Sequence, residues 1–247
     1  MNIRSQIPNL FTMANLVCGA VATIYVAQFS YFSTAIFLVF LAGFFDLLDG
    51  AIARALHVSG EMGKQLDSLA DVVSFGLVPT VVIYKLLEES LPVEYSFLRF
   101  VSLINVVSAA YRLAKFNISK DQTHDFSGMP SPANGIFWAS IMAIMAWSRV
   151  DIYADYSMIE LPIWSIMLLT LLTSFLMISK IRMFSFKFKP GGIKANLFPV
   201  SFLILVLLTA LVCTFTHLFL VCIPISILLY MVMSVFYHFS LRTDALK

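Results

Sequence analysis

Long apolar runs separated by short polar joints dominate the pattern of this chain. A bilayer core about 30 Å thick requires about 20 apolar residues per spanning helix. Eight segments approach that length, at about 10–28, 32–55, 65–87, 96–116, 132–149, 159–179, 197–216 and 219–240. The pattern therefore predicts an all-α, polytopic transmembrane helix bundle of about eight spans.

Composition supports this class and excludes an ordinary soluble domain. The chain is 60% hydrophobic and 12% charged, whereas soluble domains are about 45–50% apolar and about 25% charged. The three cysteines lie in apolar stretches without the spacing of metal ligands, which indicates packing roles. No long linker divides residues 1–247, so we expect one membrane-embedded domain.

The basic residues predict how the bundle is oriented. With eight spans and a cytoplasmic N-terminus, all but three of the 16 Lys and Arg residues fall at cytoplasmic ends. The exceptions are Lys85, Arg99 and Arg149. Because cytoplasmic loops carry an excess of Lys and Arg, we expect both termini in the cytoplasm.

An acidic cluster stands out in the second and third predicted spans. Asp46 and Asp49 share one helix side, and Asp67 and Asp71 are one turn apart on the next helix. Ionised groups at membrane depth are costly and are functional by default. The short joint 57–63 predicts that the two helices are antiparallel and adjacent, so four carboxylates converge. Such oxygens suit hard divalent cations such as Mg²⁺ or Mn²⁺.

The full pattern around these aspartates reads D-x2-D-G-x2-A-R-x8-G-x3-D-x3-D. It resembles the signature of the CDP-alcohol phosphotransferases, integral membrane enzymes of phospholipid synthesis. The resemblance implies that Asp46, Asp49 and Asp67 bind metal, as a site for two ions of Mg²⁺ or Mn²⁺. It also implies that Asp71 touches a metal and acts as general base toward the acceptor alcohol.

The same resemblance implies a nucleotide pocket beside the aspartates. Small residues there permit close approach of a ligand or helix, and Arg54 offers a planar fork for a phosphate or an ion pair with an aspartate. Asn9 is in addition expected to cap the first helix. The candidate nucleotide-binding residues are Asn9, Thr12, Asn15, Asp49, Gly50, Ala53, Arg54 and Gly63.

Two later segments indicate the acceptor. The stretches 110–117 and 125–133 resemble those of the integral-membrane phosphatidylserine synthases, which implies CDP-diacylglycerol and L-serine as substrates. This resemblance covers a catalytic core of about residues 1–190, with two extra C-terminal spans at about 197–240. The candidates for binding serine or a lipid phosphate are Arg112, Lys115, Asn117, Gly128, Pro130, Ser131 and Arg182.

The segment 180–190 alternates basic and aromatic residues. Anionic lipid headgroups attract such stretches, and a segment this short between spans does not indicate nucleic-acid binding. We therefore expect membrane lipids as partners, and the family resemblance implies a homodimer. The expected location is a bacterial or archaeal inner membrane, with the active site facing the cytoplasm.

Other functions remain open at this level. Glycerol 3-phosphate or inositol phosphate fits the same chemistry as the acceptor, because Arg112, Lys115 and Lys180 or Arg182 can form a basic pocket for a phosphorylated acceptor. From a different class, the acidic cluster fits a cation-coupled transporter. Transporters often contain internal repeats and broken helices at the midplane. Neither a repeat nor a midplane position of the cluster is evident in the sequence.

Overall fold

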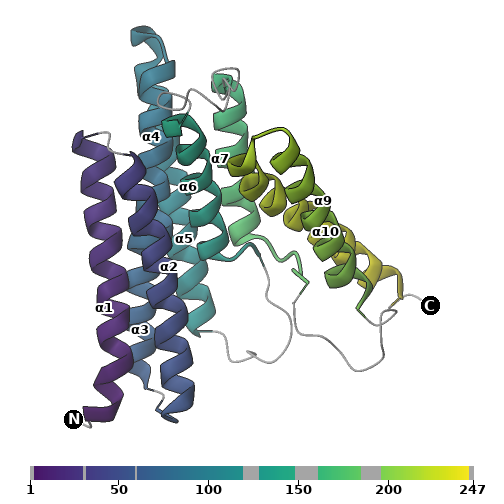
Figure 1. The fold of residues 1–247 in the computed structure, drawn as a ribbon. Helices are drawn as coiled ribbons and strands as arrows, with labels where there is room; N and C mark the ends of the chain where they lie inside the picture. The colour runs from purple at the N-terminus through teal and green to yellow at the C-terminus, as the bar shows by residue number, and fades with distance from the viewer. Residues whose placement is uncertain are drawn as a thin grey trace.

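A computed structural model describes residues 3–29, 32–58, 60–118, 128–147, 161–184 and 196–244, and these ranges contain helices and no strand. Figure 1 shows the long helices side by side in one bundle. In chain order they are α1 (Ile3–Ile24), α2 (Phe32–Ala55), α3 (Glu61–Asp71), α4 (Val78–Ser90), α5 (Leu103–Ile118), α6 (Ser131–Trp147), α7 (Ile163–Ile178), α9 (Leu197–Phe215) and α10 (Cys222–Asp244). The predicted all-α class is confirmed.

Short irregular helices extend several of these elements. Two π-helical segments, η1 (Tyr25–Phe29) and η2 (Val72–Leu77), continue α1 and join α3 to α4. Two 3₁₀ segments, η3 (Val93–Ser102) and η5 (Phe219–Val221), lead into α5 and α10. Among the described residues, six of the resulting helices are long and apolar enough to cross a membrane. Each of the eight predicted segments contains a helix, but α6 and α7 have only 17 and 16 residues.

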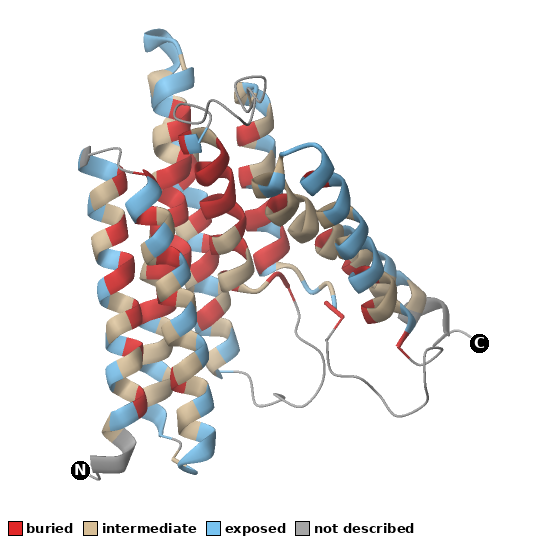
Figure 2. Cartoon of the chain, viewed as in Figure 1, coloured by how far each residue is buried: buried red, intermediate tan, exposed pale blue. Residues whose placement is uncertain are grey.

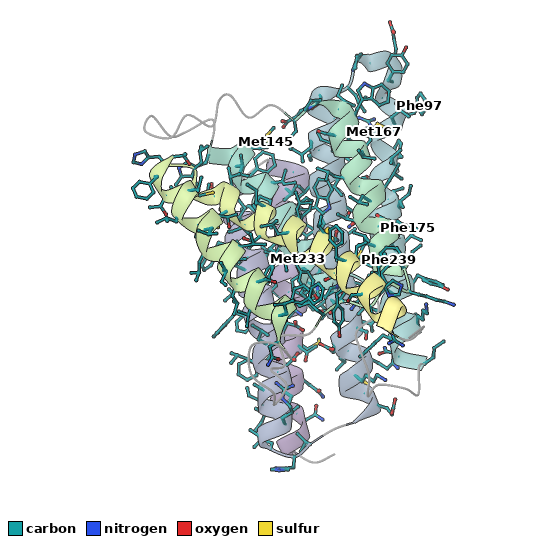
Figure 3. The ribbon with its side chains drawn as sticks, turned by 90° about the vertical axis from the view of Figure 1, so that its right-hand side faces the viewer. Phe97, Met145, Met167, Phe175, Met233 and Phe239 are labelled. Carbon is teal, nitrogen blue, oxygen red and sulfur yellow. The ribbon has the colours of Figure 1, made fainter. Side chains whose placement is uncertain are left out.

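Large apolar side chains cover the outside of the bundle. Phe37 is 64% exposed, Phe175 61% and Phe239 57%. Figure 3 shows Phe175 and Phe239 on the outside of α7 and α10. Apolar surface on this scale is not tolerated in water, and it surrounds helices of spanning length. The protein is therefore an integral membrane protein.

Helix α6 forms the centre of the fold. Most of its residues are buried, as the red helix in the middle of Figure 2 shows. Trp138 and Phe137 are buried almost completely and stack edge to face. The helix packs against α2, α4, η2 and α10. A helix that is apolar on all sides is typical of such a fully surrounded position.

A polar network fixes α6 and α5 to the π-helical segment η2. The Asn134 side chain donates to the Phe75 carbonyl at 3.3 Å and to Asn105 Oδ1 at 3.0 Å. Asn105 in turn donates to the Gly76 carbonyl at 3.1 Å. A Cβ on Gly135 would lie 2.6 Å from the Phe75 ring, so only glycine permits this close approach. The network anchors the backbone that directly follows Asp71.

The N-terminal helices differ from the sequence prediction in one respect. Helix α1 begins at Ile3 and includes Pro8, so Asn9 lies inside the helix and does not cap it. The loss of one backbone hydrogen bond at a proline does not stop the helix here. In addition, α1 packs broadly against α2 and also against α3, whereas α2 and α3 make little backbone contact with each other. Helices α2 and α3 meet at their aspartate side chains, as the short joint between them predicts.

The C-terminal helices α9 and α10 form an inclined pair at one side of the bundle (Figures 1 and 3). His217 adopts a positive φ of 58° in the tight turn that joins them. Helix α10 packs against α6, and α9 packs on α10. The pair thus lies beside the central helix, facing α5 across the cavity described below.

Candidate active site

Three aspartates from two helices meet at one point. Asp46 and Asp49 from α2 and Asp67 from α3 each offer a carboxylate oxygen, and these oxygens lie within 4.8 Å of one another. Asp49 is only 6% exposed. In the described part of the chain, no Lys or Arg forms an ion pair with any of them. Such a cluster needs a compensating cation, and an all-oxygen set fits Mg²⁺ or Mn²⁺.

Helix α1 supplies the supporting contacts on one side of this cluster. The Thr12 hydroxyl donates to Asp49 Oδ2 at 2.5 Å, and Thr12 is 3% exposed. Asn15, about one turn further on, is fully buried, and its side-chain amide has no hydrogen-bond partner among the described residues. Both side chains therefore face the interior between the first three helices. A buried amide without a partner is rare in proteins and fits a site built for a ligand.

Asp71 lies next to the three-aspartate cluster but outside it. It is 7% exposed, and its Oδ1 has no hydrogen-bond partner in the described structure. It interacts electrostatically with Asp46, Asp67 and Arg112. Asp71 therefore stands between the cluster and a basic residue on α5, where it can accept a proton or join a metal.

The remaining motif residues lie on α2 and near the start of α3. Exposed Arg54 folds over Gly50, where an added Cβ would lie 3.3 Å from its Nη1. Arg54 forms no ion pair with an aspartate in the described structure. A Cβ on Gly63 would lie 3.3 Å from Asn9 Oδ1, so this glycine brings α3 close to α1. Ala53 is half-buried one residue before Arg54.

A cavity of about 570 Å³ opens on the α5 side of the aspartates. Its size is in the usual range for pockets that hold small ligands. Asp67 and Asp71 line it, whereas Asp46 and Asp49 do not. The other lining residues are Lys64, Ser68, Arg112, Leu113, Phe116, Asn117, Pro130, Pro132, Ala133, Phe184, Phe202, Ser226, Ile227 and Tyr230.

Hydrogen bonds hold the polar wall of this cavity in place. Arg112 donates from Nη1 to the hydroxyl of buried Ser131 at 2.9 Å. Asn117 donates to Ser68 Oγ at 2.8 Å, and Lys64 Nζ donates to the Asn117 carbonyl at 3.1 Å. Residues of the two segments predicted to bind the acceptor, 110–117 and 125–133, therefore meet beside Asp71.

Four predicted acceptor candidates do not line the cavity: Lys115, Gly128, Ser131 and Arg182. Gly128 instead has φ +79°, and an added Cβ would lie 2.5 Å from the Met177 carbonyl. Gly128 packs against the end of α7, and this close contact requires a residue without a side chain. The backbone N–H of Arg182 donates to His238 Nδ1 at 3.2 Å, which ties its segment to α10.

The sequence did not point to the cavity residues beyond position 190. Lys64 lies inside the acidic motif and Phe184 inside the basic and aromatic segment 180–190, but Phe202, Ser226, Ile227 and Tyr230 come from segments without a recognised motif. One signal was present, because Ser226, Tyr230 and Ser234 recur every four residues in an apolar run and share a helix face.

Several known proteins are similar in sequence to this chain. A relative from Bacillus subtilis (strain 168), named CDP-diacylglycerol–serine O-phosphatidyltransferase, is 32% identical over 184 residues, covering 74% of this chain and 92% of the relative. A protein of the same name from Helicobacter pylori (strain J99) is 33% identical over 205 residues, covering 81% and 80%. One from Methanocaldococcus jannaschii is 34% identical over 130 residues, covering 53% and 57%.

The sequence model of one family, CDP-alcohol phosphatidyltransferase, matches residues 5–176. This range contains all four aspartates, Thr12 and Arg112, and it ends before α9 and α10. The chain therefore belongs to the CDP-alcohol phosphatidyltransferase family.

Proposed function

We propose that this protein transfers the phosphatidyl group of CDP-diacylglycerol to the hydroxyl of L-serine, which gives phosphatidylserine and CMP. The relatives that match most of the chain carry this activity in their names. The observation that carries the proposal is the position of the aspartates, of which Asp67 and Asp71 line the cavity while Asp46 and Asp49 do not.

The predicted nucleotide-binding residues lie on α1, α2 and the start of α3. None of these residues lines the cavity on the α5 side. In phosphoryl transfer the attacking and leaving oxygens are roughly in line on opposite sides of phosphorus. If CMP leaves toward the first three helices, the acceptor alcohol must therefore attack from the cavity. The hydroxyl then arrives beside Asp71.

Asp46, Asp49 and Asp67 are the residues that would hold one or two divalent cations, Mg²⁺ or Mn²⁺. Bound cations of this kind offset the negative charge on the phosphate oxygens in the transition state. Thr12 orients the Asp49 carboxylate for this purpose. These three aspartates suit a divalent cation because their carboxylates converge and because no Lys or Arg among the described residues forms an ion pair with them.

Asp71 is proposed as the general base. Serine Oγ forms the new bond to phosphorus, the bond from phosphorus to the CMP oxygen breaks, and the serine proton passes to Asp71. Arg112 lies next to Asp71 and lines the cavity. It can bind the serine carboxylate, because a guanidinium matches a carboxylate with two parallel hydrogen bonds.

The same geometry leaves an alternative acceptor within the proposal. Lys64 and Arg112 both line the cavity and would also bind the phosphate of glycerol 3-phosphate or inositol phosphate.

The proposal also includes location in a bacterial or archaeal inner membrane, an active site that faces the cytoplasm, and a homodimer. Figure 1 shows α1 beginning at the end of the bundle where α2 ends, which puts the N-terminus and the motif on one side.

The test is an assay of the purified protein in detergent with CDP-diacylglycerol and Mg²⁺ or Mn²⁺. Serine, glycerol 3-phosphate and inositol phosphate are offered separately, and lipid products are identified by mass. We expect serine-dependent CMP release and phosphatidylserine. A lipid product formed only with another acceptor would support the phosphatidyltransferase reaction but reject serine as the acceptor. If folded, metal-loaded protein transferred the phosphatidyl group to no acceptor, the phosphatidyltransferase activity itself would be rejected.

Two variants test the roles of the aspartates. Asp71→Asn is expected to lower kcat by about 10²–10⁴-fold, the usual contribution of a general base, and to keep metal-dependent thermal stabilisation. Asp67→Ala is expected to lose both. Glu61→Gln, on the exposed start of the same helix, is the matched control and should behave like wild type. Wild-type turnover in Asp71→Asn would exclude this residue as the base.

A further inference from the structure

The cavity beside Asp71 has two walls with different origins. The polar wall comes from α3, α5 and the start of α6, all within the family-matched residues 5–176. The opposite wall comes from beyond that range and is mostly apolar and aromatic. We call it the aromatic wall; its cavity-lining members are Phe184, Phe202, Ile227 and Tyr230.

Ring contacts hold the aromatic wall rigidly. The Phe184 ring lies 4.9 Å from the Tyr230 ring and 5.7 Å from the Phe202 ring, centroid to centroid, and both contacts are edge to face. The Tyr230 hydroxyl donates to the Phe184 carbonyl at 3.3 Å. Helices α9 and α10 and the segment before residue 185 are thereby fixed to one another around the cavity.

The wall offers few hydrogen bonds to water. Phe184 is 3% exposed and Phe202 9%. The Ser226 hydroxyl, which also lines the cavity, donates to the Cys222 carbonyl of its own helix at 2.7 Å. Since the Ser226 and Tyr230 hydroxyls both donate their protons within the protein, the surface that faces Asp71 across the cavity is mostly apolar.

Water is the obvious competitor of an acceptor alcohol in this reaction. A water oxygen can attack the same phosphorus, the bond to the CMP oxygen breaks, and the water proton passes to Asp71. The products are then phosphatidic acid and CMP. Exclusion of water from a closed site suppresses such side reactions.

We propose that the aromatic wall commits the phosphatidyl group to the alcohol by keeping bulk water out of the cavity. Phe202 and Tyr230 are then specificity-determining residues, because they favour transfer of the phosphatidyl group to the alcohol over hydrolysis of CDP-diacylglycerol. This inference rests on the proposed function, because it presupposes attack on CDP-diacylglycerol from the cavity.

The experiment measures phosphatidic acid and phosphatidylserine formed in the same reaction by full-length protein at saturating serine. Their ratio does not depend on the fraction of active protein. Phe202→Ala opens the wall and is expected to raise the ratio of hydrolysis to transfer about tenfold, the scale of one hydrophobic contact in specificity. Phe198→Ala is the matched control, because Phe198 lies one turn earlier and contacts Phe184 but does not line the cavity.

A second pair keeps the test open if Phe202→Ala does not fold. Tyr230→Phe keeps the ring and should leave the ratio near that of wild type, whereas Tyr230→Ala should raise it. An unchanged ratio in both alanine variants, or an equal rise in Phe198→Ala, would overturn the inference. Failure of wild-type protein to make phosphatidylserine would instead reject the proposed function.

Discussion

The hydrogen bond from Thr12 to Asp49 gives the most direct test of the metal centre. Thr12→Val removes the hydroxyl and nearly preserves the side-chain volume. The lost contact is a buried hydrogen bond of 2.5 Å to a carboxylate that we assign as a metal ligand. Because α1 carries no aspartate, the variant leaves every proposed ligand in place.

Hydrogen bonds to charged groups contribute about 1.5–3 kcal/mol. Each 1.4 kcal/mol is tenfold in a binding constant, so the loss corresponds to about 10–100-fold weaker metal binding. Residues that orient metal ligands typically have effects of this size. We expect the metal concentration for half-maximal activity to rise by that factor, while kcat at saturating metal changes only a few-fold.

The assay is a titration of activity with Mn²⁺ or Mg²⁺, together with metal-dependent thermal stabilisation measured without substrate. Thr23→Val on the same helix is the control, since the Thr23 hydroxyl donates to the Gly19 carbonyl of its own helix at 2.9 Å. A Thr12→Val protein with the metal dependence of wild type in both measurements would refute the assignment of Asp49 as a ligand held by α1.

Two further substitutions test the packing that supports the site. Gly128→Ala should lower the free energy of unfolding by about 1–3 kcal/mol, because alanine is strained at a positive φ, and it should lower Tm in detergent by about 2–10 °C. Gly60→Ala is the control and should leave Tm unchanged, because nothing lies within 4 Å of the added carbon. Asn134→Ala leaves the Phe75 carbonyl and Asn105 Oδ1 without this donor. We expect the free energy of unfolding to fall by about 1–3 kcal/mol and activity to fall as well. An unchanged Tm would contradict the role of the network.

The acidic motif could be predicted from the sequence because helical periodicity is short-range. Spacings of three and four residues put Asp46 beside Asp49 and Asp67 beside Asp71, and only a short turn joins the two helices. His57, at φ 51°, lies in that turn. The predicted convergence of carboxylates from α2 and α3 is confirmed for Asp46, Asp49 and Asp67, whereas the packing of α1 against both helices could not be predicted from the sequence.

The aromatic wall could not be predicted in the same way. In a membrane, the lipid-facing and protein-facing sides of a helix are both apolar, so the usual contrast between faces is lost. Phe202 and exposed Phe215 on α9 are indistinguishable by residue type. Which side of α9 meets the cavity depends on long-range packing through α10, and that information is not local.

The π-helical segment η2 has a consequence for how this gene can vary by insertion and deletion. A π turn accommodates one residue more than an α turn, and one residue corresponds to about 100° of rotation about the axis. Losing a single residue between Val72 and Leu77 would therefore convert the π turn into an α turn and leave the two flanking halves nearly in phase, whereas losing a second residue would rotate the aspartate half against its anchored half. These six positions should accept a deletion of one codon more readily than a deletion of two.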